Sequence, residues 1–224
     1  MGQICQLYAS ADELHAKGVN LISCDEKTGI QALQREVIPL TNKQVERQSH
    51  EYIRHGTACL IANFQVATGL VLAPSVGESR TEADFIAHIA KTVGNDPQAE
   101  WIFIVDNLNT HKSAGLVTLV AKTLQLNTPL GEKGKSGILH SMESRAKFLS
   151  DERHRIRFVY LPKRTSWLNQ VELWFSILVR RLLKRLSVCS KAELMQKIHD
   201  FIQYFNVTMA KPFKWTYQGR PLTL

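Results

Sequence analysis

The sequence predicts an α/β protein whose mixed sheet carries helices on both faces. Three segments with strand character come first, and strands then alternate with amphipathic helices. Strands that follow one another closely favour antiparallel pairing, whereas strands joined through a helix favour parallel pairing, so one sheet should contain both. The 224 residues suffice for a sizeable core, and the 44% hydrophobic and 21% charged content is typical of globular proteins. We therefore expect a single domain over residues 1–224.

The first half of the chain supplies the closely spaced strands. Residues 1–20 predict helix, and residues 21–24, 57–68 and 70–76 predict strands, with Gly69 separating the last two. Thr81 begins a helix, because Asp84 three residues later completes a capping-box pattern. The apolar residues of this helix recur with a period near 3.6, as an amphipathic helix requires; they are Phe85, Ile86, Ile89 and Val93.

The second half alternates strands and helices. The continuous apolar run Trp101–Val105 is typical of a central strand that is covered on both faces. After it we expect a helix at 113–126, a polar loop at 127–137, a short helix at 141–149 and a strand at 156–161. Two more helices are expected at about 168–186 and 191–206, the second opened by a capping box of Ser190 and Glu193.

Charge and cysteine usage narrow the class of protein. The formal net charge of +8 favours a polyanionic partner, most often nucleic acid. The four cysteines are scattered and form no CxxC pair, which argues against a zinc site and favours free thiols in a reducing cytoplasm. The sequence contains neither a signal peptide nor an apolar run long enough to span a bilayer.

Three acids stand where chemistry is expected. Asp25 and Asp106 each follow a strand-like run, and the ends of strands are where open α/β sheets place ligands. Glu172 is the only acid between Glu152 and Glu193 and falls in the first turn of a helix. Clustered carboxylates repel one another unless a cation such as Mg²⁺ or Mn²⁺ neutralises them. The alternative is that each aspartate, taken alone, is a turn former or a helix cap.

Basic and aromatic residues surround Glu172. Lys163 and Arg164 precede its helix, while Arg180, Arg181, Lys184 and Arg185 should share one side of the helix end. They could contact a DNA backbone, or simply be solvated and complement the helix dipole. Trp174 and Phe175 are expected in the core, and Trp167, before the helix, could pack or stack on a base.

Three motifs together resemble the DDE transposases of bacterial insertion sequences, in the mariner-like branch with a ribonuclease H-like catalytic domain. These motifs are ISCDEKTGIQAL around Asp25, VDNLNTHKS around Asp106 and LPKRTSWLNQVELWFSILVRR around Glu172. The resemblance extends to the closing NVTMAKPFKWTYQGRPL. It implies that the three acids are the catalytic metal ligands, that Asn107 and His111 orient the substrate, and that Lys112 also matches a residue flanking the second acid.

The chain departs from the family pattern in two places. Mariner-like proteins place the glutamate much closer to the second aspartate, and simple counting would select Glu143. The surroundings of Glu143, HSMESRAKF, lack the motif, so Glu172 is preferred and residues 130–155 read as an insertion. Family members also carry a helix-turn-helix region before the catalytic domain, and too few residues precede Asp25 to form one. A truncated chain is therefore expected.

The resemblance implies metal-dependent DNA cleavage and strand transfer with about two Mg²⁺ or Mn²⁺ ions. DNA, comprising transposon ends and target, is the expected partner, together with a second protomer or a full-length transposase in the cytoplasm, associated with the nucleoid. Two alternatives stay open: a non-catalytic remnant that binds DNA or intact transposase, and a stand-alone nuclease on the same fold.

Overall fold

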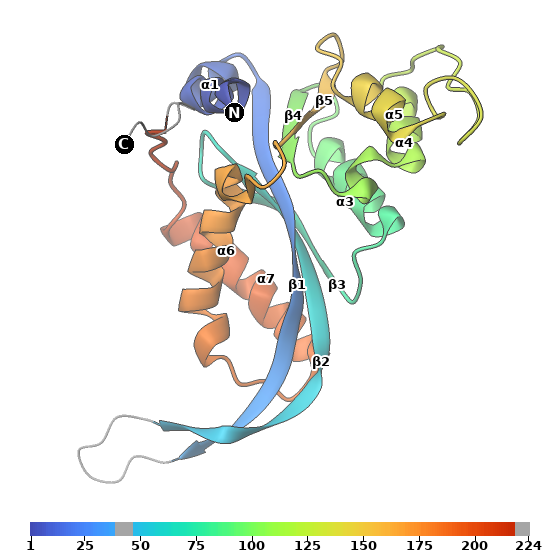
Figure 1. Ribbon diagram of the computed structural model, residues 1–224. Helices are drawn as coiled ribbons and strands as arrows, with labels where there is room; N and C mark the ends of the chain where they lie inside the picture. Colours follow the sequence, from blue (N-terminus) through green and yellow to red (C-terminus); the bar gives the residue numbers. More distant parts are fainter. Residues whose placement is uncertain (39–46, 218–224) are drawn as a thin grey trace.

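The computed structural model describes residues 1–38 and 47–217, which fold around one five-stranded sheet (Figure 1). The strands are β1 (Val19–Ile38), β2 (Arg47–Gln65), β3 (Val71–Gly77), β4 (Glu100–Val105) and β5 (Ile156–Tyr160). The helices are α1 (Gly2–Ala9), α2 (Ala11–Ala16), α3 (Glu82–Gly94), α4 (Ala114–Thr123), α5 (Met142–Leu149), α6 (Gln170–Arg181) and α7 (Lys191–Thr208). Short 3₁₀ turns occur at Asn109–Lys112, Ser166–Leu168 and Leu183–Arg185. No helix in these two described stretches is long and apolar enough to cross a membrane.

The sheet is mixed, as the spacing of the strands predicts. The strand order is β3-β2-β1-β4-β5. β2 pairs antiparallel with both β1 and β3, whereas β4 pairs parallel with both β1 and β5. The parallel strands are reached through helices, which supply the crossover connections that parallel pairing needs. The predicted mixed sheet with helices on both faces is therefore confirmed.

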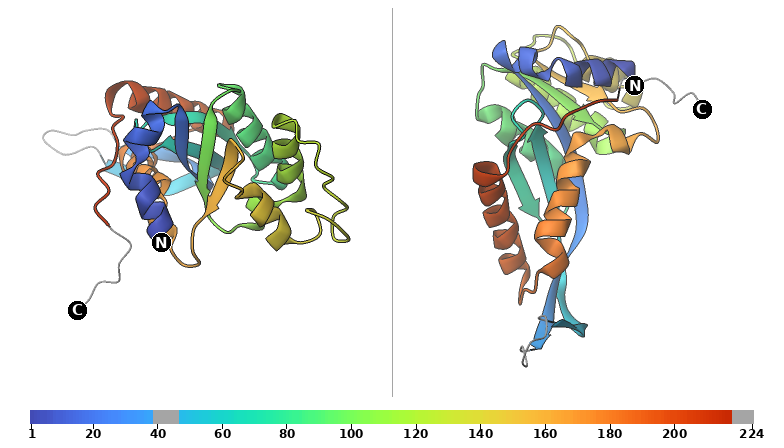
Figure 2. Two further views of the ribbon diagram at one scale, coloured as in Figure 1. Left: turned by 90° about the horizontal axis from the view of Figure 1, so that it is seen from above. Right: turned by 90° about the vertical axis from the view of Figure 1, so that its left-hand side faces the viewer.

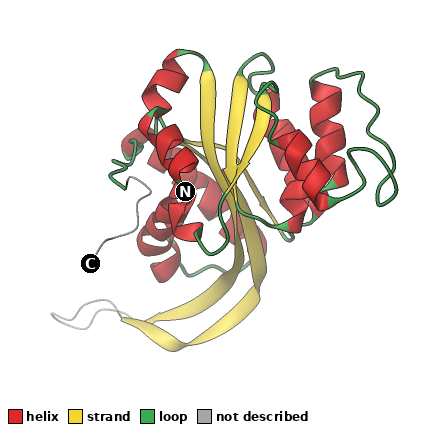
Figure 3. Ribbon diagram, turned by 45° about the horizontal axis from the view of Figure 1, so that its top comes forward, coloured by secondary structure: helices red, strands yellow, loops and turns green. Residues whose placement is uncertain are grey.

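Helices cover both faces of the sheet (Figures 1 and 3). On one face, α6 and α7 pack on β1, β2 and β3, and α1 packs beside them on β1 and β4. On the other face, α3, α4 and α5 cover β4 and β5. Alternate residues of each strand therefore reach different cores: Phe103 enters the second, and Ile102 and Ile104 the first.

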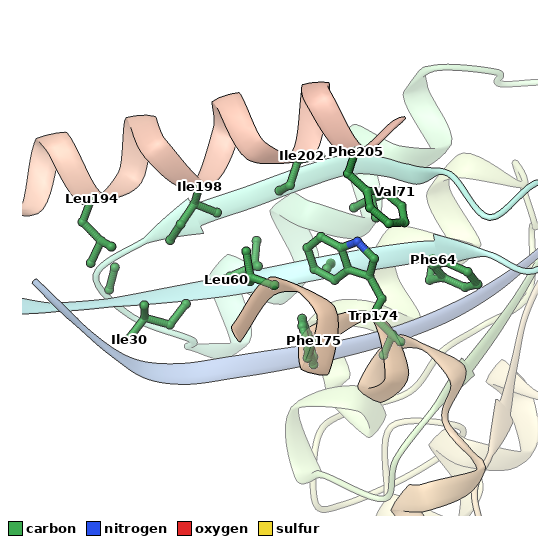
Figure 4. Close-up of a cluster of buried hydrophobic side chains, with 14 of the residues drawn as sticks. Ile30, Leu60, Phe64, Val71, Trp174, Phe175, Leu194, Ile198, Ile202 and Phe205 are labelled. Atoms are coloured by element: carbon green, nitrogen blue, oxygen red, sulfur yellow. The ribbon is translucent and has the colours of Figure 1, made fainter. Parts of the chain in front are cut away.

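The core under α6 and α7 contains the aromatic residues of the Glu172 motif (Figure 4). Trp174 is 0% exposed and Phe175 is 2% exposed, so their predicted place in the core is confirmed. They pack against Leu60 and Phe64 of β2, and α7 closes the layer with apolar residues at helical spacing; these are Leu194, Ile198, Ile202 and Phe205.

β1 is far longer than the run of residues 21–24 that predicts it. It continues through Asp25 to Ile38 and pairs with β2 along its length, although bulges interrupt the register after Lys27 and again after Gln31. Among the side chains described in the second half of the strand, as far as Arg35, Ile30 and Ala32 are buried against the α6–α7 layer, and the others are partly or fully exposed. The length of the apolar run therefore underestimates the length of β1. Beyond that layer the β1–β2 ribbon extends past the helices (Figure 1).

Helix boundaries follow their capping residues. Thr81 forms the predicted capping box with Asp84 at the start of α3. At the start of α7, Ser190 accepts a hydrogen bond from the Glu193 amide, but the Glu193 carboxylate accepts from the Cys189 amide, so only half of the predicted box forms. The helix expected at about 168–186 is shorter, because α6 ends at Arg181.

The C-terminal segment, residues 209–217, leaves α7 and runs back toward the N-terminal helices (Figures 1 and 2). It crosses the β2–β3 turn at Gly69, where an added Cβ would lie 2.1 Å from the Lys211 carbonyl oxygen. Gly69 has a φ of +74°, so glycine is required there for both conformation and space. The rest of the closing motif, from Gln218 onward, lies outside the described residues.

Candidate active site

Asp25 and Asp106 lie side by side on neighbouring parallel strands. In the β1–β4 register Ser23 pairs with Ile104, and continuing that register brings Asp25 level with Asp106. Adjacent strands are about 4.8 Å apart. β1 does not end at Asp25, as the sequence suggests, but β4 does end at Val105, so both aspartates stand at the carboxyl edge of β4.

The N-terminus of α6 is joined to β1 directly beside Asp25. Asn169, the N-cap residue of α6, donates from Nδ2 to the Cys24 carbonyl and to Asp25 Oδ2, both at 3.1 Å, and its Oδ1 accepts a hydrogen bond from the Ser23 hydroxyl. The Ser23 Oγ in turn accepts from the Val171 amide at 2.8 Å. A side chain of β1 thus caps α6, while the N-cap side chain of α6 binds β1.

This junction positions Glu172, which occupies the first turn of α6 and is exposed. Burial of Asp25 raises its pKa, and the charges of Asp106 and Glu172 raise it further, so that it reaches about 7 despite a hydrogen bond from the Glu26 amide. The other two predicted acids are therefore close enough for their charges to act on Asp25. Glu143 is exposed in the first turn of α5 and is not among the acids that act on Asp25.

Asp106, which is partly exposed, is joined to two buried charged side chains, His111 and Glu26. His111 lies 2.8 Å from Asp106 Oδ1 through Nδ1 and 3.0 Å from Glu26 Oε1 through Nε2, and its side chain is fully buried. Burial alone would lower the pKa of His111, but hydrogen bonds to both carboxylates raise it to about 9. Glu26 follows Asp25 on the strand, so it points to the opposite face and reaches His111 from behind.

The pKa of Asp106 moves in the opposite direction to that of Asp25. Burial would raise it, but hydrogen bonds from His111 and from the Leu108 amide lower it below the ordinary value. Because its side chain is buried, His111 can influence a substrate only through Asp106. Asn107 is exposed and bridges two neighbours, donating to the Leu161 carbonyl and accepting from Lys112 Nζ.

A basic cleft opens beside Asp106. It has a volume of about 380 Å³ and is lined by Asp106, Asn107 and the loop from Leu161 to Ser166, which includes Lys163 and Arg164. Arg164 has a φ of +63°, an uncommon conformation for a non-glycine residue. The two basic residues predicted to be best placed for DNA therefore lie in the same cleft as an acid of the triad.

The other predicted basic residues lie at a separate groove. Arg180, Arg181 and Arg185 line a hollow of about 580 Å³ with Ile177 and Met209. Because the helix ends at Arg181, Lys184 and Arg185 fall in a 3₁₀ turn, and the prediction that all four basic residues share one helical side is wrong. Lys184 is exposed but does not line the groove.

The carboxylates suit a divalent cation, although they are not gathered around one point. Within residues 1–38 and 47–217, no three His, Cys, Asp or Glu side chains are arranged closely enough to hold a metal ion. The oxygen donors of Asp25, Asp106 and Glu172 are those that Mg²⁺ and Mn²⁺ prefer. Burial raises the pKa of Asp25 most and the charges of Asp106 and Glu172 add to it, and a cation bound there would favour the ionised carboxylate.

Sequence comparison gives a family. A family model described as DDE superfamily endonuclease matches residues 20–195, which is most of the chain. No curated protein shows significant sequence similarity to it.

Solved structures of the Mos1 mariner transposase also match. The paired-end complex with Mn is 16% identical with a TM-score of 0.34, covering 95% of this chain and 62% of that one. The Mos1 strand transfer complex is 14% identical with a TM-score of 0.33, covering 95% and 61%. The chain thus spans about 62% of the length of the first of these structures.

Replacing Asp25 by Asn should change how stability depends on pH. The native pKa of about 7 lies above the ordinary 3.8, so native Asp25 holds a proton that the unfolded chain releases, and stability falls as pH rises from about 4 through 7. In buffer with EDTA, Asp25→Asn should exceed wild type in free energy of unfolding at pH 8 by roughly 1–3 kcal/mol, with no advantage below pH 4. Urea denaturation of wild type and Asp25→Asn at pH 8 and below pH 4 measures these differences in the free energy of unfolding. Asp12→Asn, at an exposed site on α2, is the control; an equal gain there would contradict the explanation.

Replacing Glu26 by Gln should weaken the charge on His111. We expect the pKa of His111 to fall from about 9 by roughly one to two pH units, because one of its two carboxylate partners loses its charge. The raised pKa stabilises the fold fully below about pH 6.5, and this contribution disappears as pH rises through 9, so the loss of unfolding free energy in Glu26→Gln should be largest at or just below about pH 6.5 and should vanish above pH 9. NMR titration of the imidazole measures the shift. An unchanged His111 titration would show that Glu26 is not its partner in solution.

Proposed function

Since the chain belongs to the DDE superfamily endonucleases, we propose that it is the catalytic domain of a mariner-like insertion-sequence transposase. Its activity would be divalent-metal-dependent cleavage of DNA strands at transposon ends, followed by transfer of the freed 3′ end to target DNA. Its partners would be DNA and a second transposase protomer, in the cytoplasm and associated with the nucleoid.

One observation carries this proposal: the pKa of Asp25 is raised to about 7 by burial and by the charges of Asp106 and Glu172. A structural ion pair would lower the pKa of a buried carboxyl, because an opposite charge favours ionisation. Here burial raises it most, and the charges of Asp106 at the end of β4 and Glu172 at the start of α6 raise it further, which is costly without a cation. Perturbed carboxyl groups of this kind concentrate at functional sites.

Asp25, Asp106 and Glu172 would hold the metal, in the role that the family resemblance implies. Two Mg²⁺ or Mn²⁺ ions held there would activate the attacking water or 3′-hydroxyl and stabilise the leaving oxygen. The chain's own residues would prepare the ligands. His111 holds Asp106 Oδ1 at 2.8 Å, which keeps the carboxylate ionised and oriented. Asn169 holds Asp25 Oδ2 at 3.1 Å and at the same time sets the start of the helix that carries Glu172.

The basic residues would bind the DNA backbone. Lys163 and Arg164 line the cleft beside Asp106, where they would neutralise phosphates near the reacting strand. Arg180 and Arg181 line the second groove at the far end of α6, which would bind phosphates further along the same DNA, and the exposed Lys184 lies close by in sequence. Contacts of this kind add affinity and register without reading sequence.

Glu172→Gln should abolish cleavage, whereas Glu143→Gln should retain it. Glu172 would supply a metal oxygen, and Glu143 is exposed on α5. Nicking of supercoiled plasmid DNA in millimolar Mn²⁺ measures the activity, and Asp25→Asn and Asp106→Asn should match Glu172→Gln. Loss in Glu143→Gln alone, or in both glutamate variants equally, would overturn the assignment. DNA binding without cleavage in wild type would favour the non-catalytic alternative.

Lys163→Ala combined with Arg164→Ala should weaken binding to duplex DNA of any sequence. Each phosphate contact adds about one to the slope of log affinity against log salt concentration, so the double variant should reduce that slope by about two. Fluorescence anisotropy with a labelled duplex over a salt series, in EDTA, gives the slope. Lys133→Ala with Lys135→Ala removes the same charge from the exposed 127–137 loop and serves as the control. If both double variants changed the slope equally, Lys163 and Arg164 would act only through the net charge of the protein and not through phosphate contacts in the cleft.

A further inference from the structure

Trp167 is a large aromatic side chain left open to solvent next to the basic cleft. It lies in the 3₁₀ turn Ser166–Leu168, directly after the cleft residues Thr165 and Ser166, and is 52% exposed. Its neighbours in the motif, Leu168 and Trp174, are fully buried. Burial of the Trp167 indole is therefore not needed to hold the loop.

Trp167 is supported from one side by Tyr217. The two ring centroids are 5.1 Å apart and the planes meet at 72°, so this contact can cover at most one of the two faces of the indole. An exposed indole held in this way has an open aromatic face and a restricted orientation. Both properties favour stacking on a flat ligand, because little side-chain freedom is left to lose.

Tyr217 is held in place by the C-terminal segment, residues 209–217. Phe213 stacks on Phe64 with centroids 4.7 Å apart, and Trp215 packs against Tyr8 at 4.8 Å. The close crossing at Gly69 fixes the start of the segment. These three contacts hold the C-terminal segment in place, so that Tyr217 at its end lies against Trp167.

The charges next to Trp167 indicate the ligand. Lys163 and Arg164 line the cleft whose last lining residue, Ser166, directly precedes Trp167 in the chain, and they suit a phosphate. An aromatic platform next to cationic groups is the combination that binds single-stranded nucleic acid. Within a duplex both faces of each base are already stacked on neighbours. A lone indole can therefore stack only on an unpaired or terminal base.

We propose that Trp167, supported by Tyr217, is a stacking platform for an unpaired base at a DNA strand end whose backbone is bound by Lys163 and Arg164. The platform rests on the proposed function and specifies its substrate: a frayed or cleaved DNA end rather than an intact duplex. It would hold the strand end next to Asp106 without reading its sequence, because every base presents an aromatic face.

The test compares two DNAs in EDTA, so that cleavage plays no part. One is a blunt duplex, and the other carries a few unpaired nucleotides at its 3′ or 5′ end. Wild type should bind the extended DNA more tightly, and Trp167→Ala should lose roughly five- to a hundredfold in affinity for it with little change for the blunt duplex. Trp167→Phe should keep most of the preference. A 2-aminopurine at the unpaired position should be quenched by wild type and by Trp167→Phe, but not by Trp167→Ala.

Tyr204→Ala is the matched control, since Tyr204 is an exposed aromatic residue on α7 at 58% exposure, away from the cleft. It should behave as wild type, whereas Tyr217→Ala should weaken the preference for extended DNA. Equal binding of both DNAs by wild type, or equal losses on both in Trp167→Ala, would overturn the platform and leave the proposed function intact. Failure of wild type to bind either DNA would overturn both.

Discussion

The hydrogen-bonded junction between β1 and the start of α6 is the contact on which the rest of the site depends. Ser23 caps the helix by accepting from the Val171 amide, and Asn169 donates to Cys24 and Asp25 of the strand. All of these groups are buried, so leaving any of them unpaired would be costly. The junction therefore fixes the first turn of α6, which carries Glu172 toward Asp25, and the turns that follow, which place Trp174 in the core.

The two aspartates at the carboxyl edge of β4 have pKa values that are shifted in opposite directions, although the β1–β4 register places them level with each other. Burial and nearby acids raise the pKa of Asp25, whereas His111 and a backbone amide lower that of Asp106. The difference follows from the alternation of β1. Asp25 faces α6 and its acid, while Glu26 faces α3 and helps to keep His111 positively charged beside Asp106. One pair of adjacent residues thus supplies a proposed metal ligand on one face of the sheet and, on the other face, a carboxylate that supports His111 beside Asp106.

Several segments distant in sequence meet around the basic cleft. The loop from Leu161 to Ser166 brings Lys163 and Arg164 beside Asp106. The C-terminal segment adds Tyr217 to Trp167 at the end of the same loop. The second groove, with Arg180 and Arg181, lies at the opposite end of α6. One helix and the loop before it therefore carry Glu172, basic residues of both grooves and an exposed aromatic side chain, whereas Asp25 and Asp106 come from the sheet.

The sequence by itself determined the class of fold and the order of the elements, and it singled out the three acids that we propose as metal ligands. These predictions rest on local patterns, which can be recognised in one sequence without knowing the fold. The patterns are the apolar run at Trp101–Val105, the helical periodicity and the motifs around Asp25, Asp106 and Glu172. Only the tertiary structure decided the length of β1, the end of α6 at Arg181, and the roles of Ser23, Glu26 and Asn169. These depend on pairing between residues far apart in the chain: the polar half of β1 is a strand because β2 pairs with it, and Glu26 is buried because His111 lies opposite. The pattern of one segment cannot report which distant partner will satisfy its polar groups.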